Sequence, residues 1–334
     1  MGEVHFVAED GSPLPTYEPV WAFLRTFYGA AMPARVTIVL VDGTGGHFDT
    51  ERSQIVLGRD ELKLSGPALV AHETSHLCLA VVTRGASATE AFRFLDEGFA
   101  SILEARIAGR GADYEEEAFA IAALELAKGR ASFDLLQRWS EYFGDWQGRS
   151  STRDAGSQHD FDAYRVGSSF ELWVRRFHGE GALRHLFVAV GTTRDLNQAL
   201  AEALGKPAAN VEAEWKAYLA SVKVPDDTPS VVNLVPADGA TDVSTTLPEL
   251  TVHFSTPMNR SIVNLGANCD LGVCFTNASW TSPTVLTVRL PDGLKPATSY
   301  TVTLGVEGHT LRSRYGRDLP VTTWRFSTRP QGTR

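Results

Sequence analysis

Residues 69–82 read LVAHETSHLCLAVV, an apolar run interrupted by polar side chains that can exchange protons. Burying such groups without partners costs about 2–7 kcal/mol for each neutral polar group, so the stretch needs a reason to carry them. Pro67 suits the first turn of a helix, and the pattern predicts a helix over 67–83. A helix whose polar residues simply face solvent fits poorly, because the surrounding apolar residues leave little room for a broad polar face.

Two histidines of this helix are spaced to bind one metal ion. His72 and His76 are four residues apart, which places them on one face of the helix and one turn from each other. Two imidazoles in this arrangement can bind Zn²⁺. Glu73 is rotated to the flank, where it suits a general base acting on zinc-bound water better than a ligand. The pattern is H-E-x-x-H, which is typical of zinc peptidases.

A catalytic zinc ion needs a third protein ligand and an open position for water. The longer pattern H-E-x-x-H-x-x-G-x-x-H is excluded, because Leu79 and Val82 stand where it requires glycine and histidine. The remaining candidates for the third ligand are Glu90, Asp96, Glu97, His47 and His159.

Glu97 is the favoured third ligand. A helix over 89–108 would carry its carboxylate back toward the first helix, and the small residues Gly98 and Ala100 would let the two helices approach closely. Asp96 is adjacent in sequence but points about 100° away at helical pitch.

The motifs HETSH at 72–76 and LDEGFA at 95–100 together resemble those of the gluzincin metallopeptidases. The second motif is similar to the W-L-N-E-G-F-A helix of the aminopeptidase branch and of its peptidase-MA-like relatives. The resemblance implies that His72, His76 and Glu97 bind zinc and that Glu73 is the general base.

Two further carboxylates enter through the same resemblance. A carboxylate seven residues beyond the glutamate ligand recurs in that branch, and Glu104 matches it. On a helix Glu104 shares a face with Glu97 and could orient a ligand histidine; the alternative is an ordinary solvated glutamate. Asp96 departs from the usual asparagine, but it could still accept a hydrogen bond beside the ligands.

The segment AYRVGSSFELW at 163–173 resembles the Y-x-K-G-x-x helix of the aminopeptidases. In that family the tyrosine donates a hydrogen bond to the oxyanion of the tetrahedral intermediate, which implies this role for Tyr164. A tyrosine in the core of an amphipathic helix is the alternative reading. His159, in the preceding polar segment, is the rival oxyanion donor.

The resemblance covers most of residues 30–220 and is strongest at the two zinc motifs. Aminopeptidases hold the free amine of their substrate with a G-x-M-E-N segment before H-E-x-x-H, and no such string occurs here. An endopeptidase is therefore favoured over an exopeptidase. Strands are predicted at 34–41 and 53–58, and the strand at 53–58 could align an extended substrate by β-addition.

The pattern changes at residues 222–230, VKVPDDTPS, from helical spacing to alternation with period two. Residues 229–329 begin PSVVNLVPADGATDV and continue with FSTPMN, which resembles bacterial Ig-like domains. Such domains are typical of secreted or cell-surface proteins. Cys269 and Cys274 are close enough in sequence to form a disulfide in an oxidising compartment.

Composition and charge exclude some classes of binding partner. The 334 residues are 43% hydrophobic and 21% charged with a formal net charge of -9, which argues against nucleic acid or an anionic membrane as partner. The sequence contains no run of 18 apolar residues, so it predicts no membrane-spanning helix. The first residues lack the basic and apolar regions of a signal peptide, so the protein is cytosolic or an export signal has been removed. The Ig-like resemblance favours the second.

The sequence thus predicts an α+β protein. A thermolysin-like gluzincin domain, a small sheet plus helices, is expected over 1–224, and an all-β Ig-like sandwich over 229–330. The expected function is a secreted or surface-located zinc endopeptidase acting on proteins or peptides, with a cell-surface or carbohydrate contact through the Ig-like domain. The alternatives are a zinc-stabilised adhesion or binding protein without catalysis, and a zinc hydrolase acting on a non-peptide bond.

Overall fold

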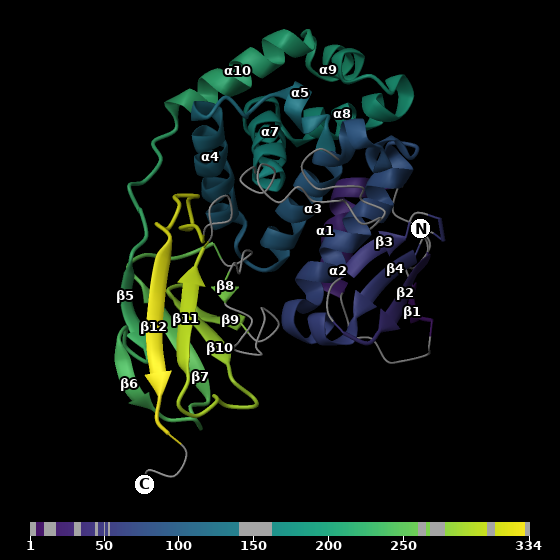
Figure 1. Cartoon of the computed structure of the whole chain (residues 1–334). Coiled ribbons are helices and arrows are strands. Elements are labelled where there is room, and N and C mark those ends of the chain that lie inside the picture. The colour runs from purple at the N-terminus through teal and green to yellow at the C-terminus, as the bar shows by residue number, and fades with distance from the viewer. Residues whose placement is uncertain are drawn as a thin grey trace. The chain divides into compact units, whose positions relative to one another are not determined.

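The computed structural model describes residues 5–9, 18–29, 35–43, 46–49, 51–52, 54–139, 162–259, 265–267, 278–305 and 311–330. These residues divide into two compact units, the first ending at Lys223 and the second beginning at Val224 (Figure 1). The division falls within the segment where the sequence pattern changes. A mixed helix-and-sheet unit is followed by an all-β unit, which confirms the coarse fold class.

The first unit contains a four-stranded sheet. Its strands, in spatial order, are β1 (His5–Ala8), β2 (Arg35–Val41), β4 (Gln54–Gly58) and β3 (Gly46–Asp49). The first three run parallel, and β3 pairs antiparallel with β4 at the edge. β2 and β4 correspond to the two predicted strands.

The strand at the edge of the sheet is not the one that the sequence analysis expects to align a substrate. β4 lies between β2 and β3, so its backbone groups are already paired on both sides. β3 is the outer strand of the described sheet on this side, and it lies between the two predicted strands, where no strand is predicted. Its four residues are too few for an alternating pattern to stand out.

The helix that carries the histidines is α2 (Arg59–Val82). Its backbone is broken at Gly66, where φ is 47° and ψ is −125°, a conformation that favours glycine. The helix restarts at Pro67, whose missing N–H costs nothing in a first turn. The predicted start of the motif helix is therefore correct, although helical residues also precede it.

The second motif lies on α3 (Arg93–Ile107), which follows a short 3₁₀ turn at Glu90–Phe92. α3 packs against α2 on one side and against α7 (Ala163–His178) on the other. A Cβ at Gly98 would lie 2.9 Å from the backbone nitrogen of Ser168 on α7. The prediction that Gly98 serves the approach of α3 to α2 is therefore wrong, because it serves the contact with α7.

Further helices cover this core. They are α1 (Glu18–Tyr28), α4 (Gly111–Ala127), α5 (Phe133–Leu136), α8 (Glu180–Thr193), α9 (Leu196–Leu204) and α10 (Ala208–Ser221). Buried aromatic rings join α5, α7 and α10, because Phe133, Phe170 and Trp215 contact one another with centroids 4.9–5.7 Å apart.

The second unit is made of two four-stranded sheets. One has the order β5 (Val231–Val235), β7 (Glu249–Phe254), β10 (Val285–Arg289), β9 (Ala278–Ser282). The other has the order β6 (Ala240–Val243), β12 (Thr322–Thr328), β11 (Ser299–Leu304), β8 (Leu265–Ala267). Alternate residues of β7, β11 and β12 are buried in one apolar core, as period-two patterns require.

Among the helices that the structure describes, none combines the length and apolar character needed to cross a bilayer.

Candidate metal centre

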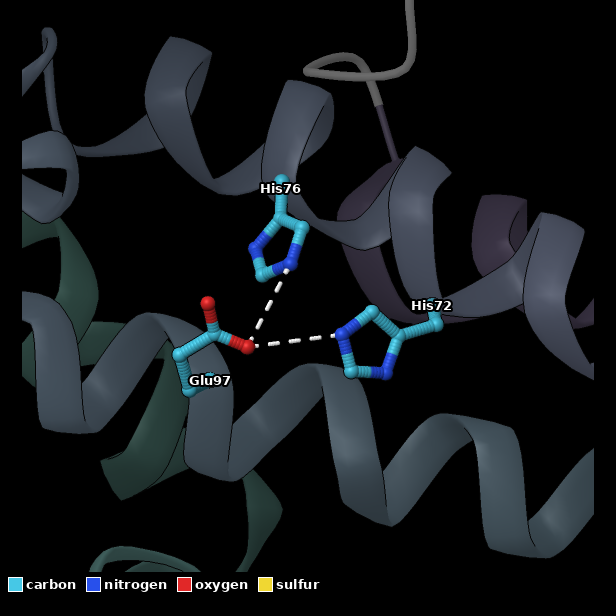
Figure 2. A group of neighbouring side chains, drawn as sticks. All are labelled: His72, His76 and Glu97. Atoms are coloured by element: carbon cyan, nitrogen blue, oxygen red, sulfur yellow. Dashed lines mark ion pairs between the residues drawn. The ribbon is translucent and has the colours of Figure 1, made fainter. Parts of the chain in front are cut away.

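His72 and His76 on α2 and Glu97 on α3 converge on one point (Figure 2). Nε2 of His72 lies 3.4 Å from Oε2 of Glu97, and Nε2 of His76 lies 3.6 Å from the same oxygen. The ring centroids are 4.9 Å apart and the ring planes meet at 78°. One ligand atom from each residue lies within 4.8 Å of the others, a spacing that can hold a metal ion.

The other ring nitrogen of each histidine faces a carboxylate. Nδ1 of His72 is hydrogen-bonded to Oε2 of Glu104 at 2.9 Å. Nδ1 of His76 lies 3.0 Å from Oδ1 of Asp96, an ion-pair distance whose angles fall outside hydrogen-bond geometry. A carboxylate on Nδ1 favours a proton there and leaves the Nε2 lone pair directed at the shared point. Asp96 therefore lies behind a histidine and not among the ligand atoms.

Arg93, which the sequence analysis did not single out, also belongs to this centre. Its Nη1 donates to Oδ2 of Asp96 at 2.8 Å, and its Nη2 donates to Oε1 of Glu97. Its spacing of i, i+3 to Asp96 and i, i+4 to Glu97 on one helix is the signal in the sequence that allows these contacts, although the spacing alone does not show that they are buried.

Electrostatics favour a cation at this point. Burial alone would lower the pKa of His72, but hydrogen bonds to Glu104 and Glu97 outweigh it and hold that pKa well above its usual range. Burial would likewise raise the pKa of Glu97, but the charges of His76, His72 and Arg93 hold it well below its usual range. Both shifts favour positive charge at this point, as is expected of a site that can contain a cation.

The donor set fits zinc. Two imidazole nitrogens and one carboxylate oxygen, with carboxylates behind the imidazoles, are the ligands and supporting groups that Zn²⁺ takes in catalytic sites. Among the described residues, this is also the group of His, Cys, Asp and Glu atoms that comes close enough to hold an ion.

Glu73 is buried beside the ligands, with 4% of its surface exposed. A Cβ at Gly46 would lie 3.3 Å from Oε1 of Glu73 and 2.8 Å from the side chain of Leu57. The backbone of the edge strand β3 therefore passes directly against Glu73, at a position that only glycine fits without displacing Leu57.

Tyr164 lies in the first turn of α7, which begins after Asp162. The side chain of Asp162 caps this helix by accepting a hydrogen bond from the backbone of Arg165. Burial and the charge of Glu97 raise the pKa of Tyr164 well above its usual range. The charge of Arg93 acts in the opposite direction but does not outweigh them. The phenol is therefore protonated at neutral pH.

The other sequence candidates do not join the cluster. Glu90 lies on the 3₁₀ turn and His47 on β3, both exposed and outside the three-residue group that the described part of the chain brings together. His159, Cys269 and Cys274 lie outside the described residues, so the rival oxyanion donor and the disulfide stay predictions.

Comparison with known families bears on the second unit. Residues 225–328 match the family model described as bacterial Ig-like domain. The match confirms the predicted Ig-like resemblance and assigns the second unit to a domain type of bacterial proteins. No curated protein matches the sequence.

Among solved structures, the chain is similar to the N-terminal part of the bacterial S-layer protein SbsC, with 16% identity over 94% of this chain and 79% of that one, at a TM-score of 0.21. Two further structures, surface layer protein SbsC domains 1–6 and the S-layer protein rSbsC, match at 15% identity over 94% of this chain. This chain spans 46% of each, again at a TM-score of 0.21. A likeness at this TM-score supports no conclusion about fold or function.

Proposed function

We propose that the first unit is a zinc-dependent peptidase of thermolysin-like gluzincin type that hydrolyses bonds within peptide chains. The observation that carries the proposal is the convergence of both Nε2 atoms on Oε2 of Glu97, with each Nδ1 facing a carboxylate. His72, His76 and Glu97 would hold the ion. Zinc bound there supplies a Lewis acid and lowers the pKa of water toward neutrality.

Glu73 is the general base of the proposed reaction. It takes a proton from the attacking water and later delivers it to the leaving amine. Its position supports this role, because it follows the ligand His72 on α2 and is buried against the backbone at Gly46. Burial limits competition from bulk water at the carboxylate.

Tyr164 donates its hydroxyl proton in a hydrogen bond to the developing oxyanion. A phenol is a neutral hydrogen-bond donor at neutral pH, and the upward shift of the pKa of Tyr164 does not change this. A positioned donor of this kind typically contributes about 10²–10³-fold to the rate.

The edge strand supports a substrate that is a peptide in extended conformation. β3 pairs with β4 on one side, and β-addition to its other side would align a peptide backbone past Glu73. Alignment through the backbone does not need a free terminus, which favours cleavage within chains. The match of the second unit to bacterial Ig-like domains supports a secreted or surface-attached enzyme, with that unit contacting the cell surface or carbohydrate.

The decisive experiment compares two buried glutamates. Glu73→Gln removes the proposed base, and Glu117→Gln is the matched control, because Glu117 is 5% exposed and pairs with Arg110 outside the site. Each zinc-loaded full-length protein is incubated with a complex peptide mixture, and cleavage sites are profiled by mass spectrometry. We expect Glu73→Gln to retain zinc and to lose about 10²–10⁴-fold in cleavage rate. Glu117→Gln should retain both.

The alternatives give different outcomes. Cleavage that survives Glu73→Gln would remove the assigned mechanism. A wild type that binds zinc stoichiometrically but cleaves no peptide would favour a binding or adhesion protein, or a hydrolase of another bond. A wild type that takes up no zinc would end the proposal.

A further inference from the structure

Arg93 bridges the two carboxylates that α3 directs at the histidines. Nη1 donates to Oδ2 of Asp96, and Nη2 donates to Oε1 of Glu97. The remaining oxygen of each carboxylate faces a histidine: Oδ1 of Asp96 faces Nδ1 of His76, and Oε2 of Glu97 faces both Nε2 atoms. One guanidinium therefore divides the four oxygens into an inner pair, turned toward the histidines, and an outer pair that it binds.

The division of the oxygens determines how Glu97 can bind a metal ion. A carboxylate can offer a metal ion one oxygen or two, and rotation about the terminal bond of glutamate is soft. Because Arg93 binds Oε1 of Glu97, only Oε2 is presented to the histidines. We propose that Arg93 is a positioning residue that selects this single oxygen as ligand and, through Asp96, holds the ring of His76 in place. The inference rests on the zinc centre proposed above.

The chemistry of the side chain supports the assignment. A guanidinium has N–H groups that point in fixed, separate directions, so it can hold two different carboxylates at once. A lysine ammonium is a compact point charge on a flexible stem and cannot fix both. The Arg93 side chain is 15% exposed, so solvent screens these contacts little.

A merely electrostatic role would have the opposite effect on zinc affinity. A positive charge beside a cation site repels the incoming ion, so its removal should tighten binding. A positioning role predicts weaker binding on removal, because the glutamate loses its orientation. The sign of the change in Kd therefore separates the two roles.

The test measures zinc affinity by competition with a chromophoric chelator, using full-length Arg93→Gln and Arg93→Lys. Arg175→Gln is the matched control, because Arg175 is 22% exposed and forms a comparable ion pair with Glu115 at 2.7 Å. X-ray absorption of the zinc-loaded proteins reports how many oxygens coordinate the ion, and thermal unfolding reports whether each variant folds.

We expect both Arg93 variants to bind zinc about 10–100-fold more weakly than the wild type and to show an additional oxygen neighbour. Arg175→Gln should match the wild type in affinity. Unchanged or tighter binding in Arg93→Gln, or full affinity in Arg93→Lys, would overturn the inference while leaving the zinc centre intact. If Arg93→Gln does not fold, Arg93→Lys, which keeps the charge, decides alone. A wild type without zinc affinity would instead remove the proposed function itself.

Discussion

The two sides of α3 handle buried carboxyl groups differently. On the side facing α2, Glu97 has Arg93 and two histidines as partners, and its pKa is held well below the usual range. On the side facing α7, Glu171 is fully buried, and neither of its oxygens has a hydrogen-bond partner among the described residues. Burial, with the charge of Asp96 adding, raises the pKa of Glu171 well above its usual range, which favours its protonated form.

The comparison teaches that burial alone does not define the metal centre. Both sides of the helix exclude water, but only one surrounds its carboxylate with groups of opposite charge. A buried, charged and partnered carboxylate is suited to bind a cation, whereas a buried neutral carboxyl is not. Four experiments test this difference between the two carboxyl groups.

The largest effect is expected from Glu97→Ala. Removing one partner of a buried ion pair typically costs about 3–5 kcal/mol, and we expect the lower end because Arg93 keeps its contact with Asp96. Urea unfolding of metal-free protein measures the loss. A Glu97→Ala protein as stable as the wild type would show that the pair is not effectively buried.

The next largest effect concerns the contact with α7. A Cβ at Gly98 would lie 2.8 Å from Oε2 of Glu171 and 2.9 Å from the backbone nitrogen of Ser168. Gly98→Ala should therefore lower the free energy of unfolding by about 1–3 kcal/mol. Gly181→Ala is the control, because Gly181 lies in α8 with nothing within 4 Å of its Cβ position, and alanine there should stabilise by up to about 1 kcal/mol. Equal effects at both positions would contradict the close helix contact.

That His72, His76 and Glu97 come together could be predicted in part from helical pitch, although the choice of Glu97 among five candidates also drew on the resemblance of LDEGFA to a zinc motif. His72 and His76 must share a face at a spacing of four, and a glutamate on the next helix is within reach. The role of Arg93 could be read from the same pitch, but most charged pairs at this spacing lie on exposed helix faces, so the spacing alone does not mark it.

Other features depend on tertiary contacts, which cannot be predicted from the spacing of residues along the sequence. A small residue such as Gly98 signals a close helix approach but does not say which neighbour approaches. The burial of Glu171 depends on the packing of α7 against α3, and the short strand β3 is held by its pairing with β4. The order of a mixed unit followed by an all-β unit could be predicted from the sequence. The hydrophobic periodicity differs over many residues on either side of 222–230, so no single position decides it.

A smaller effect is expected in the pH dependence of stability. The pKa of Glu171 is raised in the folded protein, so its contribution is fully present below the usual range of a carboxyl and is lost as the pH rises toward the folded pKa. The slope from one group is at most about 1.4 kcal/mol per pH unit. Glu171→Gln, which cannot ionise, should flatten the decline of stability above about pH 4.5 in urea titrations. A variant with the wild-type slope would show that Glu171 ionises freely in the folded protein.

The smallest effect is expected from Glu104→Gln. Its effect on the slope of stability against pH is opposite in sign to that of Glu171→Gln. Burial would raise the pKa of Glu104, but the hydrogen bond and charge of His72 outweigh it and lower that pKa. Its contribution is therefore present above the usual carboxyl range and is lost as the pH falls through the folded pKa. Because the Glu104 side chain is 43% exposed, solvent screens the pair and the change in stability should stay within about 0.5 kcal/mol. Urea titrations of Glu104→Gln and Glu171→Gln across one pH range test this directly. Slopes that change in the same direction would refute the division of α3 into a charged side and a neutral one.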